Sequence, residues 1–215
     1  MQPGGKILSV FNVSKNYGNK TILKDVNIVF PDKKINFILG RNGVGKTTLY
    51  KCILGLENYD GLIETDGRIY CVYDEQPFYL NLSGLDNIEL YKAMYNITEI
   101  SAIDNSFLDM ELLKKKVKHY SYGQRKKLAL LLADIIHPRI ILLDEASNGL
   151  DYETIKYLKS RLMKWKEDLT VLVTGHQLDF YNSVVDNVYV MKEGKLVEVG
   201  NLSDSTLEDI YEKYL

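Results

Sequence analysis

The stretch Phe37–Leu49, FILGRNGVGKTTL, places three glycines within six residues, between an apolar run and a segment with helical spacing. Glycine accepts backbone angles that other residues resist, and it has no side chain to keep an anion from the amides. The pattern Gly40-x-x-x-x-Gly45-Lys46-Thr47 is typical of a phosphate-binding loop between a strand and a helix. We therefore predict a phosphate site made by Gly40, Arg41, Asn42, Gly43, Val44, Gly45, Lys46, Thr47 and Thr48.

A second segment, IILLDEAS, supplies the acidic groups that phosphate chemistry needs. Four apolar residues predict a buried strand that ends in Asp144 and Glu145. We expect Lys46 to reach the outer phosphates, Thr47 and Asp144 to hold Mg²⁺, and Glu145 to orient the attacking water. Standing alone, the acidic pair would equally well be a solvated end of a core strand, but beside a phosphate loop it indicates catalysis.

The chain around these two segments alternates apolar strands with helical patterns, which predicts an α/β fold with a parallel sheet. Strand patterns before residue 40 and a hairpin that turns at KEGK predict an antiparallel β flank. Between residues 83 and 119 the pattern is helical, with one helix at LDNIELYKAMYNI and another at NSFLDMELLKKKVKHY. Because this block lies between two sheet-forming halves, we expect an inserted helical subdomain.

Composition favours an ordinary globular domain, with 215 residues, 46% hydrophobic residues and a net charge of -2. The absence of a basic excess argues against nucleic acid as a partner, and the basic run LLKKKVKHYSYGQRKK is read as solvated helix faces. The two cysteines, Cys52 and Cys71, make no disulfide framework. With no apolar run long enough for a membrane helix, we expect a soluble, cytoplasmic chain.

The segment YSYGQRKKLALLL, which begins at Tyr120, resembles a family signature. A Ser-x-Gly-Gln that opens an apolar helix, about twenty residues before the acidic strand, resembles the signature of ATP-binding cassette (ABC) proteins. The segment SNGLD, residues 147–151, resembles the D-loop of that family, and His176 ends a strand as its switch histidine does. Tyr122 replaces a common glycine, as in exporter-like members, and Ala-Ser follows Glu145 in place of Pro-Thr.

The resemblance implies a P-loop NTPase (RecA-like) core with the antiparallel flank and the helical insertion. It implies one ABC ATPase domain over residues 1–215, with the ATP-binding core at 1–76 and 120–215 and the helical subdomain at 77–119. The resemblance also implies that the chain binds ATP and Mg²⁺ and hydrolyses ATP. The implied catalytic residues are Glu145, His176 and Lys46. Further implied contacts to the nucleotide come from Tyr17, Gln76, Ser121, Gly123, Gln124 and Asp151.

One of these positions has two candidates. Gln76 is the only glutamine in YDEQPFYLNLSGLDNI, the segment that resembles the glutamine loop, and we predict it as a third metal contact beside Thr47 and Asp144. An ungapped match anchored on LSGLDNI instead puts Asp74 at that position.

The implied assembly is an ATP-sandwich dimer with a second copy or a homologous subunit. It docks on transmembrane permease subunits that hold it at the inner face of the cell membrane. The short helical block and YSYGQ favour export. The alternative is a soluble ABC-type ATPase of translation or DNA repair, although such proteins usually carry two cassettes or long insertions. A small-molecule kinase is a further alternative, but it would have no use for the signature.

Overall fold

The computed structural model describes residues 7–98, 108–202 and 205–215. Its central element is a six-stranded sheet whose order is β5 (Ile69–Val72), β6 (Ile140–Asp144), β7 (Thr170–Thr174), β3 (Ile35–Leu39), β8 (Asn187–Lys192) and β9 (Lys195–Gly200). The first five strands are parallel, and β9 returns antiparallel to β8 after the KEGK turn. The predicted parallel α/β sheet and the late hairpin are therefore confirmed, but the hairpin belongs to this larger sheet and not to the antiparallel flank.

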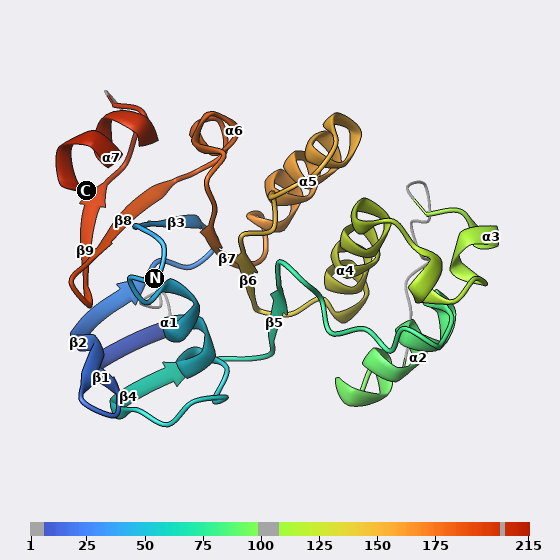
Figure 1. Cartoon of the computed structure of the whole chain (residues 1–215), viewed down its shortest axis with the longest axis horizontal. Helices are drawn as coiled ribbons and strands as arrows, with labels where there is room; N and C mark the ends of the chain where they lie inside the picture. The colour runs from blue at the N-terminus through green and yellow to red at the C-terminus, as the bar shows by residue number, and fades with distance from the viewer. Residues whose placement is uncertain (1–6, 99–107, 203–204) are drawn as a thin grey trace, which may run out of the picture.

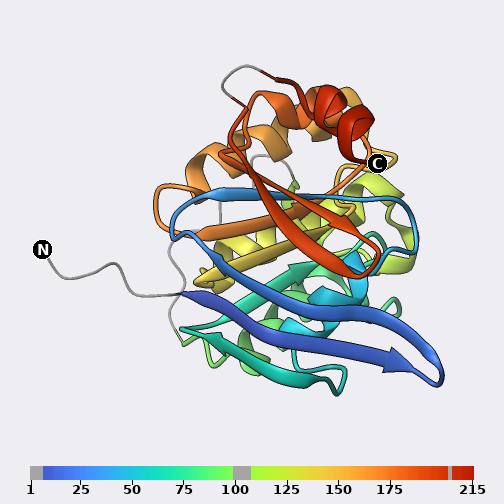
Figure 2. The same ribbon diagram turned by 90° about the vertical axis from the view of Figure 1, so that its left-hand side faces the viewer.

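A second, antiparallel sheet of three strands makes the flank, in the order β2 (Lys20–Phe30), β1 (Leu8–Tyr17) and β4 (Asp60–Thr65). Figure 2 shows this sheet, in blue and teal, below the hairpin of β8 and β9. The amide of Lys24 in β2 donates a 2.8 Å hydrogen bond to the carbonyl of Gly194 in the hairpin turn. This bond ties the flank to the larger sheet.

Helices cover both faces of the six-stranded sheet. One apolar cluster joins α1 (Lys46–Ile53) and the flank to one face, through side chains such as Tyr50, Ile140 and Leu142. Alternate residues of the same strands, such as Ile141 and Leu143, face a second cluster. The helices that contribute to that cluster are α2 (Gly84–Met94), α3 (Met110–Leu113), α4 (Tyr122–Ile136), α5 (Tyr152–Trp165), α6 (Leu178–Asn182) and α7 (Leu207–Tyr214).

The helical block lies apart from the flank, at the opposite end of the molecule in Figure 1. The prediction of one long helix over NSFLDMELLKKKVKHY is wrong for its described part, residues 108–120: α3 spans four residues and is followed by a 3₁₀ turn at Val117–His119. The backbone leaves the helix because Lys116 pairs with Ser83 in a β-bridge. Residues 105–107 of that segment lie outside the described residues.

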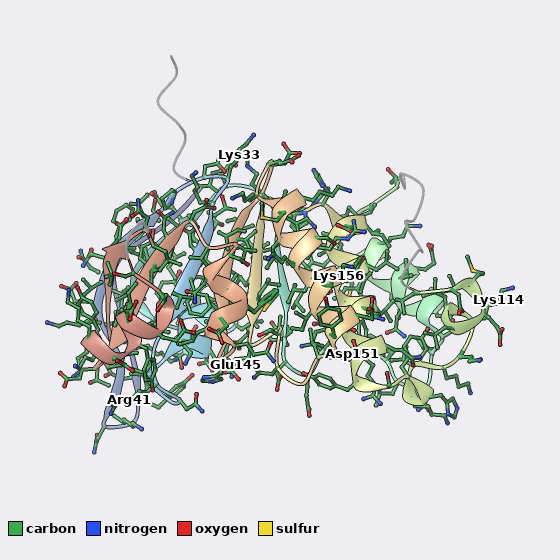
Figure 3. The ribbon with its side chains drawn as sticks, turned by 90° about the horizontal axis from the view of Figure 1, so that it is seen from above. Lys33, Arg41, Lys114, Glu145, Asp151 and Lys156 are labelled. Carbon is green, nitrogen blue, oxygen red and sulfur yellow. The ribbon has the colours of Figure 1, made fainter. Side chains whose placement is uncertain are left out.

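The topology brings the predicted site residues to one edge of the sheet. Strands β3, β6 and β7 are parallel neighbours, so their carboxyl ends meet there. Figure 3 places Arg41, Glu145 and Asp151 along one edge of the molecule, with Lys33, which precedes β3, on the opposite edge.

Candidate active site

The predicted phosphate loop joins β3 to α1 and is built on glycine geometry. Gly43 and Gly45 have φ angles of 75° and 121°, which side chains rarely allow. A Cβ at Gly45 would also lie 3.1 Å from the Ile22 side chain. Gly45 is the N-cap of α1 and contributes no side chain to cap it. The first amides of α1 are therefore open to an anion, at the positive end of the helix dipole.

Lys46 lies inside this loop, with 6% of its surface exposed. Its Nζ donates to the carbonyls of Gly40 (2.6 Å) and Arg41 (3.2 Å). Burial lowers the pKa of Lys46, against the opposing effect of the nearby carboxylates of Glu145 and Asp144. The ammonium group is thus held in the loop by carbonyl oxygens, where phosphate oxygens would be stronger partners.

Asp144, at the end of β6, receives hydrogen bonds from two threonines. Thr47 Oγ1 in α1 donates to one carboxylate oxygen and Thr174 Oγ1 in β7 to the other, each at 2.9 Å. Burial raises the pKa of Asp144, and the two hydroxyl donors act against that shift. A buried carboxylate beside a hydroxyl is a set of hard oxygen donors, which fits Mg²⁺.

Glu145 leaves the strand with a φ of 53°, so its side chain does not follow the strand alternation. Its amide donates to the carbonyl and to Oγ1 of Thr174, both at 3.1 Å. One carboxylate oxygen lies 3.3 Å from His176 Nε2, and the other accepts a 2.9 Å bond from Asn148 Nδ2. Glu145 is therefore oriented from both sides, as a group that positions a water needs to be.

Of these groups, the phosphate loop and Glu145 line one cleft, whose lining residues are Ile22, Asn42, Gly43, Gly45, Lys46, Thr47, Thr48 and Glu145. Tyr17, at the end of β1, lies near its rim and is 44% exposed. A hydrogen bond to Glu57 is the main cause that raises the pKa of Tyr17, and a bond with Thr48 opposes it. The contact with Thr48 sets the Tyr17 ring beside the phosphate loop.

The signature residues form a second group, outside that cleft. Ser121 caps α4: its Oγ accepts from the Gln124 amide (3.2 Å), and its own amide donates to Gln124 Oε1 (2.9 Å). A Cβ at Gly123 would lie 3.9 Å from Asp151 Oδ2, in ordinary contact. Asp151 in turn caps α5 through the Thr154 amide (2.8 Å). One chain thus carries two separate groups of predicted site residues.

Three predicted residues have other partners. Gln76 Oε1 accepts from the Tyr73 amide (3.0 Å), while its Nε2 lies 3.3 Å from Tyr70 Oη, so the side chain folds back on its own loop. The carboxylate of Asp74 accepts from Tyr122 Oη at 2.7 Å. Arg41 Nη2 donates to the Leu215 carbonyl. Neither Gln76 nor Asp74 is among the residues that line the cleft, and the metal contact at this loop stays a prediction.

Sequence reasoning did not single out Thr174 or Asn148. Thr174 ends the strand next to β6, so the rule that parallel strands end at one edge could have found it. Asn148 depends on the turn after Glu145, for which the sequence had no specific signal. Among the described residues, no group of three or more His, Cys, Asp or Glu side chains could hold a metal. Within the same residues, no helix has both the length and the apolar character to cross a membrane.

Comparison with known proteins identifies relatives along most of the chain. The model of the ABC transporter family matches residues 23–148. The lantibiotic transport ATP-binding protein SrtF of Streptococcus pyogenes is 31% identical over 204 residues, which cover 89% of each chain. The bacitracin transport ATP-binding protein BcrA of Enterococcus faecalis is 32% identical, covering 92% of this chain and 70% of its own. The methionine import ATP-binding protein MetN of Clostridioides difficile is 28% identical, covering 94% and 71%.

Solved structures share the fold. An ATP-binding subunit of an ABC transporter superposes with a TM-score of 0.83 at 23% identity, covering 97% of this chain and 93% of its own. The dimeric ATP-binding cassette MJ0796, described as a post-hydrolysis state bound to ADP and Pi, superposes with a TM-score of 0.80 at 22% identity, covering 90% and 98%. The predicted cassette fold is therefore confirmed.

Proposed function

Because this chain belongs to the ABC transporter family, we propose that it drives the movement of a substrate through partner membrane subunits. It is an ATP-binding subunit with ATPase activity, and the hydrolysis of ATP to ADP and phosphate is coupled to transport. The observation that carries the assignment of roles is the cleft itself, which is lined by Lys46 and Thr47 of the phosphate loop and by Glu145, directly after β6.

The nucleotide is held mainly by backbone amides of residues 40–48, with Lys46 moving from loop carbonyls to the outer phosphates. The pair Thr47 and Asp144 supports Mg²⁺ binding, because the structure already joins their oxygens. When bound, Mg²⁺ neutralises phosphate charge. Glu145 orients the water, and His176, 3.3 Å from that carboxylate, holds it in place and senses the γ-phosphate. The exposed ring of Tyr17 stacks on adenine.

A dimer completes the site. Ser121, Gly123, Gln124 and Asp151 lie outside the cleft of their own chain, and Ser121 stands at the start of the fifteen-residue helix α4. An exposed helix start attracts anions. We therefore assign these residues to the γ-phosphate held by a second copy or by a homologous subunit, so that ATP joins the two chains.

The membrane subunits dock on the helical side of the molecule. A groove there is lined by Asp74, Glu75, Gln76, Pro77, Phe78, Leu80, Tyr122, Arg125 and Lys126. Leu80 of this lining is 44% exposed, and its neighbour in the sequence, Tyr79, is 57% exposed. Apolar side chains beside mixed charges suit a short amphipathic segment of a partner. Such docking would hold the chain at the inner face of the membrane.

Export stays a prediction from the sequence, and it agrees with similarity to SrtF and BcrA, although an importer subunit is also a relative. Identification of the membrane protein encoded beside this chain would test it. The alternative role in translation or DNA repair is not favoured, because the relatives named above are transport and import proteins. Co-purification with ribosomes or nucleic acid in place of membranes would revive it.

The direct test is Glu145→Gln, which replaces the carboxylate base with an uncharged amide of nearly the same size. We expect this variant to bind ATP, to lose hydrolysis and to elute as a dimer in gel filtration with ATP, while the wild type elutes as a monomer after turnover. A variant that stays monomeric with ATP and still releases phosphate would overturn the role of Glu145.

A further inference from the structure

Two side chains of α4, one helical turn apart, hold the loop that follows β5. Lys126 Nζ donates to the carbonyls of Tyr73 (2.7 Å) and Asp74 (2.9 Å). Tyr122 Oη donates to Asp74 Oδ1 (2.7 Å) and lies 3.3 Å from the Asp74 carbonyl. Positions i and i+4 share one face of a helix. The loop at residues 73–74 is therefore fastened to the first two turns of α4.

The Lys126 contact is specific because the side chain is buried. Only 2% of Lys126 is exposed, and the helix beyond it is apolar from Leu128 to Ala133. A buried ammonium group is costly unless its N–H groups find acceptors. Here the acceptors are two fixed backbone carbonyls, which define the position of the loop relative to α4.

Tyr122 also lies close to a third segment. A Cβ built at Gly149 would lie 3.4 Å from the Tyr122 ring, and Gly149 has a φ of 63°. A larger residue at 149 would compete with the ring for space. The phenol of Tyr122 thus packs between the turn that follows Glu145 and the loop at Asp74.

This arrangement links two regions with different proposed partners. Ser121, which precedes Tyr122, faces the ATP of a second chain, while residues 74–78 line the groove for the membrane subunit. We propose that Tyr122 and Lys126 are positioning residues that make the signature end of α4 and the loop at 73–78 move as one unit. The proposal rests on the proposed function, because it concerns how nucleotide binding reaches the docking groove.

The experiment measures backbone amide exchange with and without ATP in the full chain carrying Glu145→Gln, which retains the nucleotide. In this parent protein, we expect ATP to slow exchange in three peptides, over residues 40–48, 121–125 and 73–80. In Tyr122→Phe and in Lys126→Met, we expect ATP still to protect residues 40–48 and 121–125, whereas the protection of 73–80 is lost.

Tyr211→Phe is the matched control, because Tyr211 is 38% exposed, as is Tyr122, and lies on α7. We expect the control to behave as the parent. Full ATP-dependent protection of 73–80 in Tyr122→Phe would overturn the proposal, and this conservative variant decides the matter if Lys126→Met fails to fold. A parent protein with no ATP-dependent protection of 40–48 would instead overturn the proposed function.

Discussion

Thr47 and Asp144 are 97 positions apart in the sequence, yet the hydroxyl of the first donates to the carboxylate of the second at 2.9 Å. Thr47 belongs to the first turn of α1 and Asp144 to the last position of β6, and Thr174 of β7 binds the other carboxylate oxygen. Three elements thus meet at one carboxylate. The hydrogen bond from Thr47 joins the phosphate loop to the acidic strand.

This junction predicts a metal-dependent defect for Thr47→Ala. Loss of the hydroxyl removes one of the proposed metal contacts, so we expect the Mg²⁺ concentration for half-maximal ATPase activity to rise by about tenfold or more. The measurement is phosphate release over a Mg²⁺ titration at saturating ATP. Thr174→Val is the control, since it removes the other donor to Asp144 and we expect it to lower stability by about 1–3 kcal/mol with a smaller Mg²⁺ shift. Equal Mg²⁺ shifts in both variants would contradict the assignment.

The turn after Glu145 predicts a positioning role for Asn148. Asn148→Ala removes the donor to one Glu145 oxygen and leaves His176 on the other. We expect kcat to fall by about tenfold, which is less than the loss for a missing general base, and KM for ATP to stay within a factor of about two. Steady-state kinetics checks both values.

Asn182→Ala is a matched control for that change, because Asn182 Nδ2 donates to Glu208 Oε2 at 2.8 Å, between α6 and α7. It removes the same kind of bond, together with one that Asn182 Oδ1 accepts from the Leu207 amide, outside the lining of the cleft, so we expect lower stability with unchanged kcat. If Asn148→Ala leaves kcat unaltered, Asn148 does not orient Glu145.

The sequence predicted the strands whose side chains are buried on both faces. IILLD and TVLVT are continuous apolar runs, and both are fully buried β-strands. It missed β4, DGLIET, because five of its six residues are exposed and show no alternation. That strand exists because its backbone pairs with β1. A partner strand 50 residues away gives no local signal in the sequence.

The candidate site was predictable to the same extent. The phosphate loop and the Asp144–Glu145 pair are contiguous motifs, so residue order alone indicates them. Contacts that depend on folding could not be predicted. Nothing in the sequence indicates that Tyr122 binds Asp74 or that Asn148 binds Glu145. For Gln76, motif position predicts a metal contact, which stays a prediction, and in the structure its side chain accepts a hydrogen bond within its own loop.

A buried cluster between α4 and α5 predicts a stability effect that leaves the cleft intact. Asp134 accepts a 2.7 Å bond from Trp165 Nε1 and pairs with Arg161 Nη1 at 3.0 Å. Asp134→Ala leaves a mostly buried cation and an indole N–H without this acceptor. We expect a loss of about 3 kcal/mol in the free energy of unfolding, and a smaller loss for Asp134→Asn, which keeps one oxygen. Urea unfolding measures both, and ATP affinity should not change. Equal stability of Asp134→Ala and wild type would contradict the cluster's role.

The buried Lys126 predicts a contribution to stability that rises with pH in the alkaline range. Burial lowers the pKa of Lys126 to about 8 in the folded protein, well below its ordinary value of 10.5. Between these values the Lys126 side chain binds more protons in the unfolded chain than in the folded one, so its contribution to the free energy of unfolding increases with pH. The slope from one such group is at most about 1.4 kcal/mol per pH unit. Below pH 8 the cost of burying the charge is fully present.

Lys126→Met isolates this effect. We expect the stability difference, wild type minus Lys126→Met, to grow as pH rises from 8 towards 10. Burial raises the pKa of the neighbouring Cys71, Tyr73 and Tyr122 groups, so they stay neutral in the folded protein while they ionise in the unfolded chain. The opposing slope that they cause is present in both proteins and cancels in the difference. Urea midpoints of both proteins at pH 7, 8, 9 and 10 supply the comparison. A difference that stays flat, or shrinks with pH, would mean that burial does not lower the pKa of Lys126 in the folded protein.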